Sequence, residues 1–211
     1  MVNKKDLNFE TKVIHAGQKS DPTTGAVMTP IVLASTFEQS SPGIHKGYDY
    51  SRSINPTREA FENCIASLEN GVKGYGFSAG VAAISACIEL LSPGDHVIAM
   101  DDLYGGSVRL FNEIKTISQG IEVSYVDMTN VDNIKANLKE NTKMIFVETP
   151  TNPLLKIADL SKIARLAKAN KILTVCDNTF ASPFNQQPLD HGFDIVIHSA
   201  TKYLGGHSDL I

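Results

Sequence analysis

A lysine near the end of the sequence has surroundings that could support covalent chemistry. Lys202 follows Ser199 and Thr201 and precedes the glycine pair 205–206. The apolar run 194–197 predicts a buried strand just before it. A lysine amine can bond to an aldehyde when desolvation or a cationic neighbour lowers its pKa, and neighbouring hydroxyls suit a phosphate. Taken alone, a lysine in a loop is most often a solvent-exposed surface residue.

An acidic residue ends a second apolar run, 173–176. The carboxylate of Asp177 could pair with a pyridinium nitrogen and keep it protonated, as an electron-sink cofactor requires. The alternative is a turn residue or a helix N-cap, which is equally common for aspartate. Together, the aspartate, the hydroxyls and Lys202 suit pyridoxal 5′-phosphate (PLP).

A glycine turn opens one of the predicted helices. Ser78-Ala79-Gly80-Val81 follows a short predicted strand at 73–77 and begins a helix of small residues that runs to about Leu91. The free backbone N–H groups of a helix N-terminus can bind a phosphate. The sequence has neither GxGxxG nor a Walker pattern here, so it gives no support to a dinucleotide or nucleoside-triphosphate domain. The alternative is that small residues only allow close packing of the helix on a sheet.

The elements that must position these residues alternate between strand and helix. Asn55 is predicted to cap a helix that starts at Pro56 and is closed by Gly71. Further strands are predicted at 96–100, 121–126, 144–147, 172–176 and 194–197, and further helices at 104–117, 131–138 and 160–169. This alternation predicts an α/β fold with a mainly parallel sheet covered on both faces. The polar candidates that follow strands are Ser78, Tyr104, Asn152, Asp177 and Lys202, which should meet at the carboxyl edge of the sheet.

Composition excludes several other classes of protein. The 211 residues carry a net charge of −4 and no basic run, so nucleic acid is not an expected partner. No apolar stretch is long enough to cross a membrane, and residues 1–6 lack the apolar core of a signal peptide. Cys64, Cys87 and Cys176 show no metal-binding spacing, and each lies in an apolar run. We therefore expect buried reduced thiols in a cytoplasmic protein that holds no metal.

Several motifs resemble the Cys/Met-metabolism family of PLP-dependent enzymes. The resemblance is carried by residues 176–183, 199–203 and 206–209, by Tyr50-Ser51-Arg52 with Asn55-Pro56-Thr57-Arg58, and by 148–152. It extends from about Ile14 to the last residue. It implies the large domain of the aspartate aminotransferase-like fold, fold type I. Members of this family are nearly twice this long, so the resemblance implies an N-terminal arm at 1–55, an incomplete PLP-binding domain at 56–211, and no C-terminal small domain in this chain.

The resemblance also implies roles for individual residues. Lys202 would carry the cofactor and move a proton, Asp177 would pair with the ring nitrogen, and Tyr104 would stack on the ring. Ala79 and Val81 depart from the usual serine and methionine of the family, but backbone donors do not depend on these side chains. The full set of implied cofactor contacts is Tyr50, Arg52, Ser78, Gly80, Val81, Tyr104, Asn152, Asp177, Thr179, Ser199, Thr201 and Lys202.

The expected activity is trans-sulfuration on a small sulfur amino acid. Residues 47–52 and 100–107 look most like those of a cystathionine γ-lyase, which releases cysteine, 2-oxobutanoate and ammonia. Cystathionine γ-synthase, methionine γ-lyase and cystathionine β-lyase remain alternatives, as does an inactive cofactor-binding fragment. The resemblance implies a homotetramer built from homodimers, in which Tyr50 and Arg52 bind the cofactor phosphate of the adjacent protomer.

Overall fold

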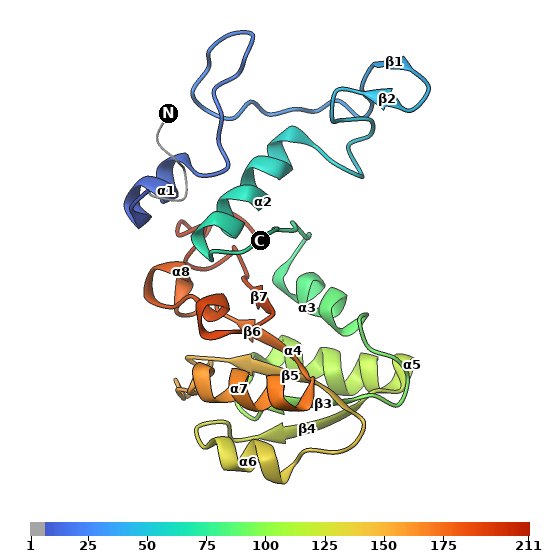
Figure 1. Ribbon diagram of the computed structural model, residues 1–211, viewed down its shortest axis with the longest axis vertical. Coiled ribbons are helices and arrows are strands. Elements are labelled where there is room, and N and C mark those ends of the chain that lie inside the picture. The colour runs from blue at the N-terminus through green and yellow to red at the C-terminus, as the bar shows by residue number, and fades with distance from the viewer. Residues whose placement is uncertain (1–6) are drawn as a thin grey trace. The chain divides into compact units, whose positions relative to one another are not determined.

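A computed structural model describes residues 7–211 (Figure 1). Residues 1–6, whose polar sequence argued against a signal peptide, lie outside the described residues. The chain forms two compact units, one extending to Gly76 and the other covering Phe77–Ile211. The expected division at residue 55 would place the following helix in the second unit, whereas its contacts place it in the first. In the described part of the chain, no helix combines the length and apolar character needed to cross a membrane.

The first unit contains little regular structure. Its elements are α1 (Phe9–His15), β1 (Gln39–Ser41), β2 (Ile44–His45) and α2 (Pro56–Leu68), with β1 and β2 antiparallel. The predicted N-cap of α2 is confirmed, because the Asn55 side chain accepts hydrogen bonds from the N–H groups of Thr57 and Arg58.

The end of α2 differs from the prediction. The left-handed residue is Asn70, with φ of 55°, rather than Gly71. The Gly71 N–H donates to the Ala66 carbonyl, which completes a Schellman cap with asparagine in the position that glycine usually takes.

The predicted strand at 73–77 is wrong. This segment lies along α2: a Cβ on Gly74 would be 2.2 Å from the Glu62 carbonyl oxygen, and the Gly76 N–H donates to Glu62 Oε1 at 2.8 Å. Its backbone is therefore held by one helix, and none of the strand pairings among the described residues includes it.

The second unit is built on a five-stranded parallel sheet. In chain order its elements are α3 (Gly80–Ile88), β3 (His96–Met100), α4 (Gly105–Arg109), η2 (Leu110–Lys115), α5 (Thr116–Gln119), β4 (Glu122–Val126), α6 (Val131–Ala136), β5 (Thr142–Glu148), α7 (Leu160–Asn170), β6 (Leu173–Asp177), α8 (Ser182–Asn185), η3 (Pro188–His191) and β7 (Ile195–Ile197). The strand order is β4-β3-β5-β6-β7. In Figure 1, α6 and α7 lie on one face of the sheet and α3, α4 and α5 on the other. The predicted α/β fold is confirmed.

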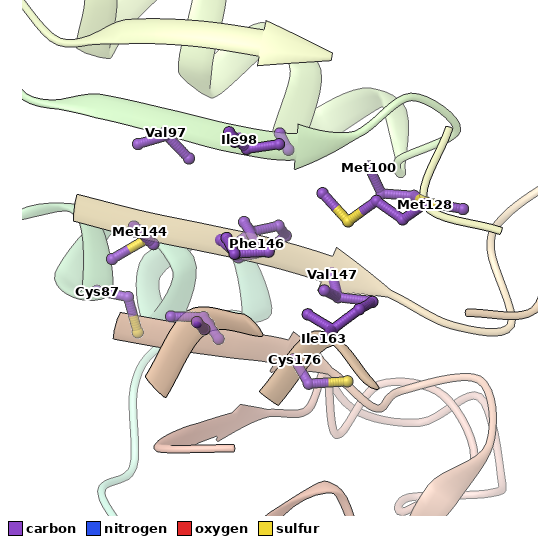
Figure 2. Close-up of a cluster of buried hydrophobic side chains, with 14 of the residues drawn as sticks. Cys87, Val97, Ile98, Met100, Met128, Met144, Phe146, Val147, Ile163 and Cys176 are labelled. Carbon is purple, nitrogen blue, oxygen red and sulfur yellow. The ribbon is translucent and has the colours of Figure 1, made fainter. Parts of the chain in front are cut away.

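The core lies between the sheet and these helices. β3 and most of β5 are fully buried, as expected for central strands covered on both faces. Figure 2 shows Phe146 of β5 among apolar side chains of neighbouring elements. Phe146 packs edge-on against Phe111, with ring centroids 5.4 Å apart. Cys87 and Cys176 are buried in this core and form no disulfide, whereas Cys64, which was also expected to be buried, is only partly buried. Burial raises the pKa of Cys87 to about 11. This rigid sheet fixes the strand ends from which the candidate residues project.

Candidate functional site

Four candidate residues lie along one edge of the sheet. Tyr104 follows β3, Asn152 follows β5, Asp177 is the last residue of β6, and Lys202 follows β7. These four strands are consecutive neighbours and parallel, so their carboxyl ends lie side by side. The sheet topology therefore brings together residues that are up to about a hundred positions apart, at the place where open α/β sheets bind ligands.

The glycine turn reaches the same edge. A Cβ added to Gly80 would lie 2.9 Å from the Cβ of Ser199, closer than two such atoms approach. The N-terminus of α3 is therefore packed directly against the segment that follows β7. Ala79, the N-cap residue, makes no side-chain hydrogen bond, so no side chain of the cap satisfies the first N–H groups of α3, including those of Gly80 and Val81. These groups and the Ser199 hydroxyl lie together and could hold an anion, and we refer to them as the anion cradle.

Thr179 joins two of the strand ends. Its N–H donates to Asp177 Oδ1 at 3.0 Å, and its hydroxyl accepts a hydrogen bond from the Ser199 N–H at 2.8 Å. The predicted acid at the end of β6 and the predicted phosphate contact after β7 are thus held in one hydrogen-bonded chain. Motif resemblance had included Thr179, and the structure gives it this bridging position.

Asp177 is a buried carboxyl group. Burial raises its pKa above the ordinary value of 3.8, and the hydrogen bonds from Thr179 and the nearby His198 act in the opposite direction. Burying a carboxylate is costly without a partner of opposite charge. A ligand with a cationic ring nitrogen would supply that partner and stabilise the ionised form.

Lys202 lies in an exposed turn. Its N–H donates to the Ser199 carbonyl at 3.2 Å, and its carbonyl accepts from the Gly206 N–H at 2.8 Å. Its side chain is exposed, while Thr201 beside it is partly buried. The turn fixes the lysine backbone next to Ser199 and leaves the amine open to a ligand.

A buried glutamate lies between Tyr104 and Asn152. Glu148, the last residue of β5, is 4% exposed and accepts the N–H of Tyr104 at 2.9 Å and that of Asn152 at 3.0 Å. Burial raises its pKa to about 7, and the neighbouring carboxyl groups of Asp177 and Asp102 contribute in the same direction. Glu148 belongs to the sequence motif at 148–152, but the motif predicts no role for this residue. Its position at the end of a buried strand was the only available signal.

Tyr50 and Arg52 belong to the first unit, so the structure does not place them with the edge of the sheet. They contact each other: an Arg52 nitrogen donates to the Tyr50 hydroxyl at 2.9 Å. Arg58, in the first turn of α2, donates to the carbonyls of Ser51 and Ser53 and pairs with Glu62. The guanidinium and phenol are thus presented on a turn that α2 holds in shape. Ser78 is exposed in the turn before α3.

Comparison with known proteins gives a consistent result. The family model described as "Cys/Met metabolism PLP-dependent enzyme" matches residues 10–211. The chain is 57% identical over 209 residues to a cystathionine β-lyase of Coxiella burnetii, covering 99% of this chain and 54% of that protein. It is 47% identical over 206 residues to a probable cystathionine γ-synthase of Herpetosiphon aurantiacus, covering 98% of this chain and 64% of that protein.

A solved structure agrees with the same family. The crystal structure of cystathionine γ-lyase from Lactobacillus plantarum complexed with L-serine superposes with a TM-score of 0.94 at 49% identity, covering 97% of this chain and 53% of that one. The chain spans about half the length of the first relatives that it matches.

Proposed function

This chain belongs to the Cys/Met metabolism family of PLP-dependent enzymes, and from that premise we propose that the protein carrying it is a carbon–sulfur lyase acting on cystathionine. The observation that carries the proposal is the arrangement at the carboxyl edge of the sheet. There a buried acid, an anion cradle and an accessible lysine lie at the ends of adjacent strands.

The residues at this edge fit PLP. The cradle of Gly80, Val81 and Ser199 suits its phosphate, because a helix N-terminus and a hydroxyl supply donors to an anion. The buried carboxyl group of Asp177 suits its ring nitrogen. Bound PLP would supply an electron sink for the negative charge that develops at the substrate Cα.

The chain's own residues would then bind the cofactor and move protons. Lys202 would hold the cofactor through its side-chain amine, and the same amine, when free, would take the proton from the substrate Cα. Asp177 would keep the ring nitrogen protonated. The Tyr104 ring would pack on the cofactor, and its hydroxyl would donate a proton to the departing sulfur. Asn152 would donate a hydrogen bond to the cofactor's ring oxygen, and Ser78 and Thr201 would add polar contacts around its phosphate.

Tyr50 and Arg52 complete the proposal across a subunit interface. Their phenol and guanidinium suit a phosphate, since arginine offers paired donors. We assign them to the phosphate site of an adjacent copy, in homodimers that assemble into a homotetramer. A cytoplasmic location is part of the same proposal, and buried cysteines that form no disulfide, Cys87 and Cys176, support it.

The position of the bond that is cleaved defines two candidate reactions. Residues 47–52 and 100–107 favour γ-elimination, which yields cysteine, 2-oxobutanoate and ammonia. One observation favours β-elimination, namely the 57% identity with a cystathionine β-lyase. β-Elimination would yield homocysteine, pyruvate and ammonia. Identifying the oxo acid that forms from cystathionine distinguishes the two reactions. If neither oxo acid is released, the lyase proposal is refuted.

Borohydride reduction tests the lysine assignment. Reduction of the PLP-loaded protein should fix a pyridoxyl group on the peptide that contains Lys202, and Lys202→Ala should abolish both this label and turnover. Lys143→Ala, which changes an exposed lysine on β5, is the matched control. A pyridoxyl label on another lysine, or normal turnover by Lys202→Ala, would refute the assignment.

A further inference from the structure

Glu148 occupies an unusual position for a carboxylate. It lies at the end of a central strand, opposite Asp177 in the register of β5 and β6, and it is 4% exposed. The contacts that the structure gives its side chain are two backbone N–H donors, and no lysine or arginine is among them. An ion pair therefore does not explain why a charged group is buried here.

Its two partners belong to two different loops. Oε2 accepts the N–H of Tyr104, in the loop after β3, and Oε1 accepts the N–H of Asn152, in the loop after β5. One carboxyl group thus spans the gap between two residues that were assigned to the cofactor on other grounds. Both contacts are to the main chain, so they fix the origin of each side chain rather than its tip.

The tether on Tyr104 combines with a steric constraint on its ring. A Cβ added to Gly106 would lie 2.3 Å from Cε1 of Tyr104, so the ring rests on the bare backbone of this glycine. Glu148 thus holds the backbone N–H of Tyr104, and the backbone of Gly106 packs against its ring. These contacts leave the aromatic face a narrow range of orientations, although the side chain is 45% exposed.

Other contacts already hold the two loops together. Asp102 accepts hydrogen bonds from the Thr151 hydroxyl at 2.5 Å and the Leu154 N–H at 2.9 Å, and Lys156 pairs with Asp101 at 2.7 Å. These groups attach one loop to the other. The contacts of Glu148 differ, because they fix the positions of Tyr104 and Asn152 within those loops.

We propose that Glu148 is a positioning residue that sets the Tyr104 ring and the Asn152 side chain against the cofactor. The inference rests on the proposed function, since Tyr104 and Asn152 are assigned to the cofactor there. A two-oxygen carboxylate is needed because both partners are donors. Glutamine has one acceptor oxygen and would turn its NH₂ group toward the other N–H. Aspartate keeps the charge and shortens the reach.

The test compares Glu148→Gln and Glu148→Asp in the PLP-loaded protein. Small misplacements of a reacting group can lower rates by about 100-fold. We expect both variants to lower kcat by about 10- to 100-fold with KM changed by less than about threefold, and to weaken the visible circular dichroism of the bound cofactor. Asp102→Ala is the loop control: it removes the oxygen that accepts from both Thr151 and Leu154, so it should lower thermal stability while leaving that dichroism unchanged. Glu140→Gln makes the same replacement at an exposed site and controls for the loss of one negative charge.

A double-mutant cycle shows whether Glu148 acts through Tyr104. In a Tyr104→Ala background, Glu148→Gln should weaken the dichroism much less than in the parent, because the ring that it positions is absent. Equal effects in both backgrounds would overturn the proposal. Parent-like kcat and dichroism in Glu148→Asp would also overturn it, since charge rather than reach would then matter. If Glu148→Gln does not fold, Glu148→Asp alone decides by the same two measurements.

The outcomes are separable from those of the proposed function. Failure of that function appears as absence of the pyridoxyl label on Lys202 or as no oxo acid released from cystathionine by the parent protein. If only the role of Glu148 is wrong, the parent protein carries the label and turns over cystathionine, and the Glu148 variants match its kcat and dichroism.

Discussion

Replacing Gly80 with alanine should disrupt the proposed anion cradle without unfolding the chain. The added Cβ would lie 2.9 Å from the Ser199 Cβ and 3.2 Å from its Cα. Rotation of the serine side chain moves neither of these atoms, so relief requires a backbone shift. The Ser199 N–H is held by the Thr179 hydroxyl at 2.8 Å, which resists such a shift.

The size of the effect follows from the overlap. Inserting one carbon into a close-packed contact costs about 1 to 3 kcal/mol. If this cost displaces Ser199 from the anion cradle, the same free energy is lost from PLP binding. The affinity should then fall by about 5- to 150-fold, because each 1.4 kcal/mol is a factor of about ten. The fold itself should tolerate the change, because the φ of Gly80 lies outside the left-handed region and alanine favours helices.

The assay is a titration of the apoprotein with PLP, followed by visible absorbance, with thermal unfolding measured in parallel. Gly105→Ala is the matched control: it also adds a methyl group at the first residue of a helix at this edge, and its nearest neighbour, an Arg109 nitrogen, is 3.8 Å away. Parent-like PLP affinity in Gly80→Ala would refute the reasoning. Equal losses in both variants would show that the helix ends, rather than the contact with Ser199, are sensitive.

Three further changes test other parts of the structure. Burial raises the pKa of Glu148 from 4.5 to about 7, so ionising this carboxyl group should cost the folded state about 3 kcal/mol. The free energy of unfolding of the apoprotein should therefore fall by about this amount between about pH 4.5 and 7. Glu148→Gln should not show this fall, and urea unfolding at several pH values measures the difference. His96 is fully buried, and that burial lowers its pKa. The stability that the neutral imidazole contributes to the fold should therefore be present above pH 6.5 and be lost as the pH falls. The difference in unfolding free energy between the parent and His96→Gln should shrink on acidification, and a constant difference would contradict this. Asn55→Ala removes the N-cap of α2 and should lower stability by about 1 kcal/mol, whereas the exposed Asn137→Ala should not lower it comparably; equal thermal shifts would speak against the cap.

Much of the second unit could be predicted from the sequence because its strands are short apolar runs with clear ends. The predicted strand at 96–100 coincides with β3, and the predicted helix at 160–169 differs from α7 by one residue. Parallel strands buried on both faces need continuous apolar stretches, and such stretches are visible in one dimension. The segment 73–77 was missed because its conformation depends on α2, whose Glu62 takes its backbone donor.

The sequence by itself determined the chemistry: a lysine and an acid at strand ends, hydroxyls beside them, and motifs specific to one family of PLP-dependent enzymes. Only the tertiary structure decided how these groups are held. Thr179 bridges Asp177 and Ser199, and Glu148 holds Tyr104 and Asn152, through hydrogen bonds to backbone N–H groups. Every residue except proline carries such a donor, so side-chain identity does not mark which ones are used. That choice depends on the order and register of the strands, which place remote loops within hydrogen-bonding distance.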